Sequence, residues 1–334
     1  MNSKLTPKDL IDTEDFDLVQ SLNMGGSRLK TKKKIKRSEH AVLDELIRYN
    51  TTGSVSDEQA FTPTFTSSRA EREWILTYLG TFHDEQIITD VLARVKGGKE
   101  ANVYCCEAFP GLGVELLAAK IYRPRMLRNL RNDAMYREGR SVIDESGKAV
   151  LNDRALHAVR KGTTYGKELS HVSWLGHEYQ TLETLFQAGA DVPKPLASGP
   201  NTILMEYLGE VYNPAPTLHE VHLSSRVEAK RIYERLIHNV DLMLSCNRVH
   251  GDLSAFNVLY WEGEFRIIDF PQAIDPRDNR SSFAIFRRDL VRLCQYFERY
   301  GIVSRPDSLA RHMWRQHRLD DLWDAQNTDW EDVG

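Results

Sequence analysis

The sequence predicts an α+β protein, with strands in its first half and helices in its second. The runs VLARVKGGKEANVYCCEAF and VELLAAKIY follow each other closely and are typical of strand, glycine-containing loop, strand and strand again. Apolar residues then recur at helical spacing in three later runs: HVSWLGHEYQTLETLFQAGA, RVEAKRIYERLIHNVDLMLSCNR and SSFAIFRRDLVRLCQYFERYG. With 334 residues, the chain has room for one two-lobed domain with an extra segment, or for two small domains.

Composition narrows the function classes. With 41% hydrophobic residues, 28% charged residues and a formal net charge of -4, the whole chain has no excess of charge that would favour nucleic acid or a membrane surface. No apolar run approaches the roughly 20 residues needed to span a bilayer, and the polar N-terminus is unlike a signal peptide. The four cysteines lack CxxC or Cys/His metal spacing. We therefore expect a cytoplasmic protein with reduced thiols and no membrane segment.

The region before the first strand is expected to be an N-terminal extension. Residues 1–68 combine a basic run at 28–37 with a linker rich in threonine, serine and glycine, which predicts partial disorder. Charge runs are usually solvated, but this one could also dock on RNA or on an acidic partner. Both interpretations stay open. The charged, weakly periodic residues 123–172 are expected to form a partly mobile insertion.

A buried ion pair is predicted between the strands and the first long helix. Lys120 is flanked by apolar residues in LLAAKIY, and an unpaired buried ammonium is costly. In the helix predicted at 173–188, with Gly189 as its stop, Glu178 falls on the apolar face. The alternative is that both side chains extend to water. The loop before Lys120, from Lys96 to Asn102, could bring backbone N–H groups close to phosphates, although glycine pairs are also common in ordinary turns.

The stretch HGDLSAFNVLYWEGEFRIIDF predicts a β-hairpin with polar groups at its open end. A turn at Glu262 and Gly263 joins strands at 258–261 and 264–268. In this register Tyr260 faces Phe265, and Val258 faces Ile267.

Three oxygen-bearing side chains meet at the open end of this predicted hairpin. The register brings Asn257 next to Asp269, and Asp252 arrives from the preceding helix. A carboxylate with a carboxamide oxygen suits Mg²⁺, and a nearby carboxylate can orient a hydroxyl and accept its proton late in phosphoryl transfer. The alternative is a hairpin that merely ends in polar residues. The spacing of the whole set favours a phosphoryl-transfer site.

Five motifs resemble those of RIO kinases, within the protein-kinase-like superfamily: GGKEANVY, AAKIY, HGDLSAFN, IIDFPQAI and FRRDL. The resemblance spans roughly residues 80 to 310. It implies a two-lobed α+β kinase-like fold with an antiparallel-sheet N-lobe and a reduced helical C-lobe that lacks the usual activation segment. The expected organisation is a kinase domain at 69–318, with N-lobe at about 80–204, hinge at 205–208 and C-lobe at 209–318, followed by an acidic tail at 319–334.

The resemblance also implies site residues and cofactors. Asp252 would be the catalytic aspartate, Lys120 would contact the α- and β-phosphates of ATP and pair with Glu178, and Asn257 and Asp269 would bind Mg²⁺, or Mn²⁺ in its place. The expected nucleotide-binding residues are Gly97, Gly98, Lys99, Glu100, Ala101, Asn102, Val103, Lys120, Met205, Glu206 and Leu208. Tyr207 completes the hinge, whose backbone would recognise adenine.

The implied activity is serine/threonine protein phosphorylation, including autophosphorylation within 123–172. Ser254 stands where ordinary protein kinases carry lysine, and the residues after Asp269 are too few for the usual peptide-binding helices. ATP hydrolysis coupled to a conformational switch is therefore an alternative output. The family implies a role in ribosome maturation, and the basic run at 28–37 is compatible with a ribosomal or RNA-containing partner. The rival classes are a small-molecule phosphotransferase of the aminoglycoside or choline kinase type and a non-catalytic nucleotide-binding scaffold.

Overall fold

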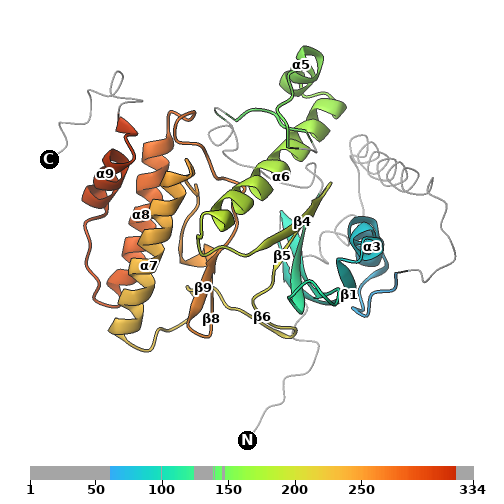
Figure 1. Cartoon of the computed structure of the whole chain (residues 1–334), viewed down its shortest axis with the longest axis horizontal. Helices are drawn as coiled ribbons and strands as arrows, with labels where there is room; N and C mark the ends of the chain where they lie inside the picture. The colour runs from blue at the N-terminus through green and yellow to red at the C-terminus, as the bar shows by residue number, and fades with distance from the viewer. Residues whose placement is uncertain (1–60, 99, 124–137, 139, 145–146, 321–334) are drawn as a thin grey trace, which may run out of the picture. The chain divides into compact units, whose positions relative to one another are not determined.

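The computed structural model describes 61–98, 100–123, 138, 140–144 and 147–320 (Figure 1). The chain divides into two units, Met1–Gln59 and Ala60–Gly334, and every described residue belongs to the second. The predictions for the basic run, for Lys99 and for most of the acidic tail lie outside the described residues.

An antiparallel five-stranded sheet forms the small lobe, in the order β1-β2-β3-β5-β4. Its strands are β1 Ile88–Gly97, β2 Ala101–Ala108, β3 Leu116–Tyr122, β4 Pro195–Gly199 and β5 Thr202–Glu206. The sequence analysis missed β4, because the prolines in its VPKPLASG segment weaken a strand pattern and are tolerated only at an edge such as this one. Lys120 lies on β3 opposite Val103 and Ile203.

Helix α3 (Arg69–Asp84) lies beside β1, and a separate apolar core fills the space between them (Figure 1). The Ser68 side chain caps the helix by accepting from the Glu71 N–H, and the face with Ile75 and Leu79 is buried. The described residues 61–68 fall within the predicted N-terminal extension, 1–68. Phe65 donates its N–H to Val91 O at 2.9 Å and packs on this core, so the segment from residue 61 belongs to the lobe.

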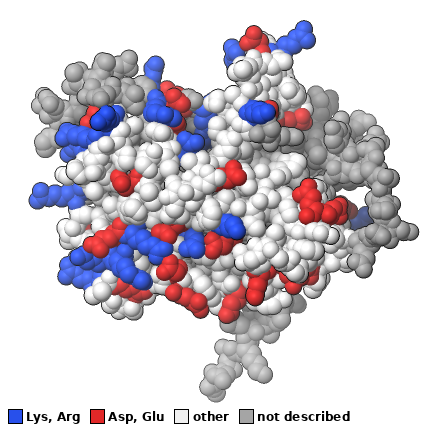
Figure 2. Space-filling view, in the orientation of Figure 1, with Lys and Arg blue, Asp and Glu red and all other residues white. Residues whose placement is uncertain are grey.

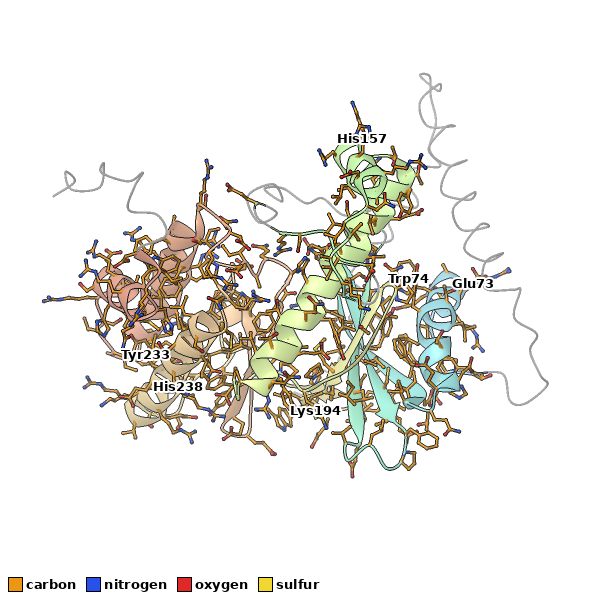
Figure 3. The ribbon with its side chains drawn as sticks, turned by 45° about the horizontal axis from the view of Figure 1, so that its top comes forward. Glu73, Trp74, His157, Lys194, Tyr233 and His238 are labelled. Atoms are coloured by element: carbon orange, nitrogen blue, oxygen red, sulfur yellow. The ribbon has the colours of Figure 1, made fainter. Side chains whose placement is uncertain are left out.

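Among the described residues after β3, the next helices are α5 (Asp153–Lys161) and α6 (Thr164–Gln187). Figure 3 shows α5, which carries His157, at the outer end of α6. The later part of the predicted partly mobile insertion, 123–172, is therefore helical. Helix α6 begins at Thr164, nine residues before the predicted start, because Thr163 caps it and Gly166 packs against the backbone of Ala158 in α5.

The large lobe is helical apart from short strand pairs. Its helices are α7 (Arg226–Ser245), α8 (Ser282–Glu298) and α9 (Pro306–Gln316), and α9 packs on α8 (Figure 1). Residues 270–281 alone separate Asp269 from α8, so no long activation segment intervenes. Leu319, the first residue of the predicted acidic tail, is buried in this core. The predicted α+β class, with an antiparallel small lobe and a helical large lobe, is confirmed.

The described surface carries both positive and negative side chains, as the near-balance of 44 Lys and Arg with 48 Asp and Glu in the sequence leads one to expect. The face shown in Figure 2 carries side chains of both signs, with Lys and Arg mainly over its left part and Asp and Glu scattered across it and along its lower right edge. Among the described helices, none has the length and apolar character needed to cross a bilayer. The four cysteines are free, and three of them are buried.

Asp191 connects α6, α7 and the hairpin strand β9 (Glu264–Ile267). Its carboxylate accepts from Arg235 Nε at 2.8 Å and from Asn239 Nδ2 at 2.7 Å, and its backbone O accepts from Ile267 N at 2.8 Å. Burial alone would raise the pKa of Asp191, but the hydrogen bonds from Arg235 and Asn239 outweigh burial and lower the pKa below its ordinary value of 3.8. The folded protein therefore stabilises the ionised form of the Asp191 carboxyl group.

We expect Asp191→Asn to lower the free energy of unfolding by about 1–2 kcal/mol near neutral pH, measured by urea titration. Because the folded pKa is depressed, the stabilisation is complete above the unfolded pKa and is lost as pH falls through the folded pKa. The difference between variant and wild type should therefore shrink below about pH 4. Asp307→Asn, which breaks the exposed Arg287 pair, is the control and should change stability by about 0–1 kcal/mol. A pH-independent difference would contradict this assignment.

Candidate active site

The hairpin forms in the predicted register. Strand β8 (Val258–Trp261) pairs with β9 so that Tyr260 lies opposite Phe265, and Val258 lies opposite Ile267. Glu262 and Gly263 both have positive φ, 49° and 86°, which is the geometry of a tight two-residue hairpin turn. At the open end, Ile268 N donates to the carbonyl O of Asn257 at 2.9 Å. The pairing therefore continues one step beyond the strands and brings Asn257 close to Asp269.

The loop that carries Asp252 is anchored by buried polar groups. His250 Nε2 bonds to Ile268 O at 3.1 Å, while the Asp252 N–H donates to His250 Nδ1 at 3.2 Å, so the hydrogen bonds fit a neutral imidazole protonated at Nε2. Gly251 has φ 84° and donates its N–H to the buried Asp289 carboxylate at 2.8 Å. A Cβ at Gly251 would collide with the backbone O of Gln272. This position therefore requires glycine.

Asp252 itself is half-exposed and has two polar neighbours. Arg292 Nη1 of α8 lies 2.8 Å from one carboxylate oxygen. Asn257 Nδ2 donates to the backbone O of Asp252 at 3.0 Å, which leaves Asn257 Oδ1 available as an acceptor. The sequence analysis did not find Arg292, although FRRDLVR places it at helical spacing, one turn beyond Arg288.

The predicted ion pair between Lys120 and Glu178 forms. Lys120 Nζ lies 2.9 Å from Glu178 Oε1, and the Glu178 side chain is only 4% exposed. The ammonium also contacts Asp269 Oδ1 at 2.5 Å, a third member that the sequence analysis did not pair with Lys120. Burial alone would lower the pKa of Lys120, but the carboxylates of Asp269 and Glu178 raise it well above its ordinary value. The lysine is therefore charged throughout the physiological pH range.

Tyr122 and the backbone of Asp269 complete this cluster. Tyr122 donates its hydroxyl to Glu178, so both carboxylate oxygens of the buried glutamate are bonded. Asp269 has φ 74°, a left-handed conformation that costs energy for a residue with a side chain. Burial would raise the pKa of Asp269, but Lys120 lowers it below its ordinary value. The carboxylate is thus held ionised next to Asn257.

A cavity of about 360 Å³ lies over one face of the sheet, next to this cluster. Strand register explains which residues reach it, since alternate residues share a face. Val103 and Ile203 lie opposite Lys120, and Ala118 pairs with Met205; all of them line the cavity. The predicted site residues that line it are Gly98, Glu100, Ala101, Val103, Lys120, Glu178, Met205, Glu206, Leu208, Asn257 and Asp269.

Two of the predicted loop residues do not line the cavity. Gly97 pairs with Asn102 at the end of β1, so both belong to strands rather than to the turn. The Asn102 side chain donates to Tyr104 OH at 3.2 Å, on the opposite face of the sheet. The turn between β1 and β2 is therefore shorter than the loop predicted from Lys96 to Asn102. Lys96, which was not among the expected nucleotide-binding residues, lines the cavity. Apolar wall residues such as Ala118 were missed, although their spacing of two from Lys120 is visible in LLAAKIY.

The donor set is suited to a phosphate-bound hard cation. Among the described residues, no group of three or more His, Cys, Asp or Glu is arranged to hold a metal. A carboxylate at Asp269 and an amide oxygen at Asn257 are oxygen ligands of the kind that Mg²⁺ takes when phosphates and water complete its shell. The residues present therefore fit a cation that arrives with a nucleotide.

The family model and the relatives found by comparison with known proteins all belong to the RIO family. A model of the RIO domain matches residues 134–309. The chain is 29% identical over 239 residues to serine/threonine-protein kinase RIO1 of Chaetomium thermophilum, covering 69% of this chain and 43% of that protein. It is 33% identical over 221 residues to the RIO-type serine/threonine-protein kinase Rio1 of Haloferax volcanii, covering 64% and 66%. The matched region thus spans less than two thirds of either relative.

A solved structure has the same fold. The Rio2 kinase from Chaetomium thermophilum aligns with a TM-score of 0.50 and 19% sequence identity, covering 97% of this chain and 91% of that one. The region expected from the motifs, roughly 80 to 310, starts earlier than the matched RIO domain and ends next to it.

We expect Lys120→Met to lower the free energy of unfolding by about 3–5 kcal/mol, because it leaves the Glu178 carboxylate buried without its cation. Lys120→Met with Glu178→Gln should recover part of this loss, since glutamine is neutral and still accepts from Tyr122. Urea titrations of both single variants and the double variant measure the coupling. The exposed pair Lys230 and Glu234 is the matched control and should show coupling of about 0–0.5 kcal/mol. Strictly additive effects at Lys120 and Glu178 would contradict the assignment.

Proposed function

Because this chain belongs to the RIO domain family, we propose that it is a kinase that transfers the γ-phosphoryl group of ATP to a serine or threonine hydroxyl. The observation that carries the proposal is the placement of Lys120 between two carboxylates at the edge of a cavity beneath the sheet. A lysine held in this way keeps its charge and a fixed position, which is what binding of phosphate oxygens requires.

Each polar residue of the site has a distinct part in this proposal. Lys120 binds the α- and β-phosphates, and Glu178 positions it. Asp269 and Asn257 hold Mg²⁺, or Mn²⁺, which would neutralise charge on the phosphate oxygens. Asp252 orients the acceptor hydroxyl and takes its proton late in the transfer. Gly98, Glu100 and Ala101 lie at the turn that would cover the phosphates.

The apolar part of the cavity would take the adenine. Val103, Ala118 and Ile203 form one wall, and the backbone at Met205–Leu208 would recognise the edge of the base. The Glu206 side chain is already engaged by Arg266, with Nη2 to Oε1 at 3.2 Å, so its contribution to nucleotide binding would come from its backbone. The kinase domain would then extend over about 61–320, with this segment as the hinge between lobes.

The acceptor is proposed to be protein, including the chain itself within 123–172. The relatives are serine/threonine-protein kinases by name, which supports a hydroxyl on protein as the acceptor. Hydrolysis of ATP coupled to a conformational switch is the second output, and the short 270–281 connection favours it because the chain has no activation segment to bind a peptide. A cytoplasmic location and a ribosomal or RNA-containing partner for the 28–37 run are further parts of the proposal.

The test is incubation of the purified protein with Mg²⁺ and γ-labelled ATP, following label on protein and phosphate released. Asp252→Ala, Asn257→Ala and Asp269→Ala should each lower turnover at least about 100-fold while thermal unfolding changes little. Label on wild-type protein alone supports the kinase, and released phosphate without labelled protein supports the ATPase switch. Bound ATP with neither signal would overturn the enzyme and favour the scaffold. Equal turnover by Asp252→Ala and wild type would overturn the role of Asp252.

A further inference from the structure

A second cavity, of about 560 Å³, lies next to the proposed nucleotide cavity. Phe256 and Asn257 line both, so they form the boundary between the two. Asp269 faces the first cavity and Asp252 faces the second. Under the proposed function, a hydroxyl that accepts the phosphoryl group must approach Asp252 from this second side. The second cavity is therefore where the acceptor would lie.

The second cavity is positively charged. Its lining contains Arg292 and Arg299 but only one carboxylate, Asp252. Arg292 lies in the C-terminal half of α8, and Arg299 is the C-cap residue that follows the helix with helical backbone angles. The two positions are seven apart, so they lie on one face of the helix, with Gln295 between them. Helix α8 thus presents a row of donors along the cavity wall. The overall charge of -4 conceals this local excess.

The two arginines are held differently. Arg292 Nη1 lies 2.8 Å from Asp252 Oδ1, and both side chains are 42% exposed. Because the pair is open to solvent, an incoming anion can compete with Asp252 for the arginine. The Arg299 guanidinium lies over the ring of Tyr296, 4.4 Å from its centroid, and among the described residues no carboxylate forms an ion pair with it. Tyr296 is itself fixed by donating its hydroxyl to Leu218 O at 2.5 Å. Arg299 is therefore a positioned cation whose donors are available to a ligand.

We propose that this cavity binds the acceptor as an acidic polypeptide segment, with carboxylates or a phosphate beside the hydroxyl that reacts. Arg299 would bind one anionic group, and a second would draw Arg292 away from Asp252. Release of Asp252 from its ion pair would leave its carboxylate able to orient the hydroxyl. Acidic acceptors would thus be selected both by binding and by exposure of Asp252. This inference rests on the proposed function, since it assigns the acceptor of the same site.

A polypeptide fits this cavity better than a nucleic acid strand. Nucleic acid binding without sequence preference needs a track of cations along many phosphates, whereas the described lining offers two arginines and ends at a carboxylate. The exposed Phe256 ring already stacks on His219, with centroids 4.0 Å apart, so one of its faces is occupied. The remaining apolar edge suits the side chain of a short peptide.

The experiment measures binding without turnover. Fluorescently labelled serine peptides, with glutamate, glutamine or lysine on both sides of the serine, are titrated with the full chain in Mg²⁺ and a non-hydrolysable ATP analogue. We expect the glutamate peptide to bind about tenfold more tightly than the glutamine peptide, and the lysine peptide more weakly than both. Arg299→Ala should remove most of this preference, whereas Arg299→Lys should retain part of it.

Controls separate charge at the cavity from charge in general. Arg311→Ala removes an exposed arginine from α9 that lines neither cavity, and it should leave the preference unchanged. Thermal unfolding verifies that each variant is folded. Equal affinity of the wild type for the glutamate and glutamine peptides would overturn the proposal, as would a preference that survives in Arg292→Ala with Arg299→Ala. Displacement of the peptide by single-stranded RNA of equal charge at lower concentration would also overturn it, in favour of nucleic acid.

The peptide-binding experiment and the ATP-turnover experiment can fail separately, so failure of the acidic acceptor is distinguishable from failure of the proposed kinase activity. If γ-labelled ATP is turned over but the peptides show no preference, the kinase stands and the acidic acceptor fails. If the preference depends on Arg299 while no ATP is turned over, the anionic site stands and the enzyme fails.

Discussion

The ammonium of Lys120 is the point on which the rest of the site depends. It joins the sheet to α6 through Glu178 and to the end of the hairpin through Asp269, so one charge ties together three elements that are distant in sequence. Lys120 and Glu178, whose side chains are 14% and 4% exposed, are stable only as a pair, because loss of either one leaves the other charge buried without compensation. Under the proposed function, the carboxylate of Asp269 that contacts Lys120 would also hold Mg²⁺.

Much of this arrangement could be predicted because it follows from local periodicity. The apolar residues that flank Lys120 in LLAAKIY predict a buried strand, and the hairpin register follows from the Glu262 and Gly263 turn. The pairing with Glu178 followed from one helical face. The family motifs added the roles of these residues, which neither periodicity nor burial can supply.

Other features depend on tertiary packing and could not be predicted in this way. The early start of α6 requires Gly166 to meet α5, and the attachment of Phe65 to β1 requires a core formed by distant strands. The contact between Arg292 and Asp252 crosses 40 residues of sequence. The pairing of Asn102 with Gly97, and the contact of its side chain with Tyr104, depend on the register of β1 and β2 rather than on the glycines of the loop. In each case, the start of a helix, the position of a segment or the partner of a side chain is determined by residues elsewhere in the sequence.

The measurement that tests the central claim most directly is a crystal structure of the protein with Mg²⁺ and a non-hydrolysable ATP analogue. We predict that the metal lies between Asn257 and Asp269, that Lys120 keeps its contact with Glu178 while its Nζ reaches the α- and β-phosphates, and that the base lies between Val103 and Ile203 and the Met205–Leu208 backbone. A nucleotide bound elsewhere, or a metal that contacts neither Asn257 nor Asp269, would contradict the account.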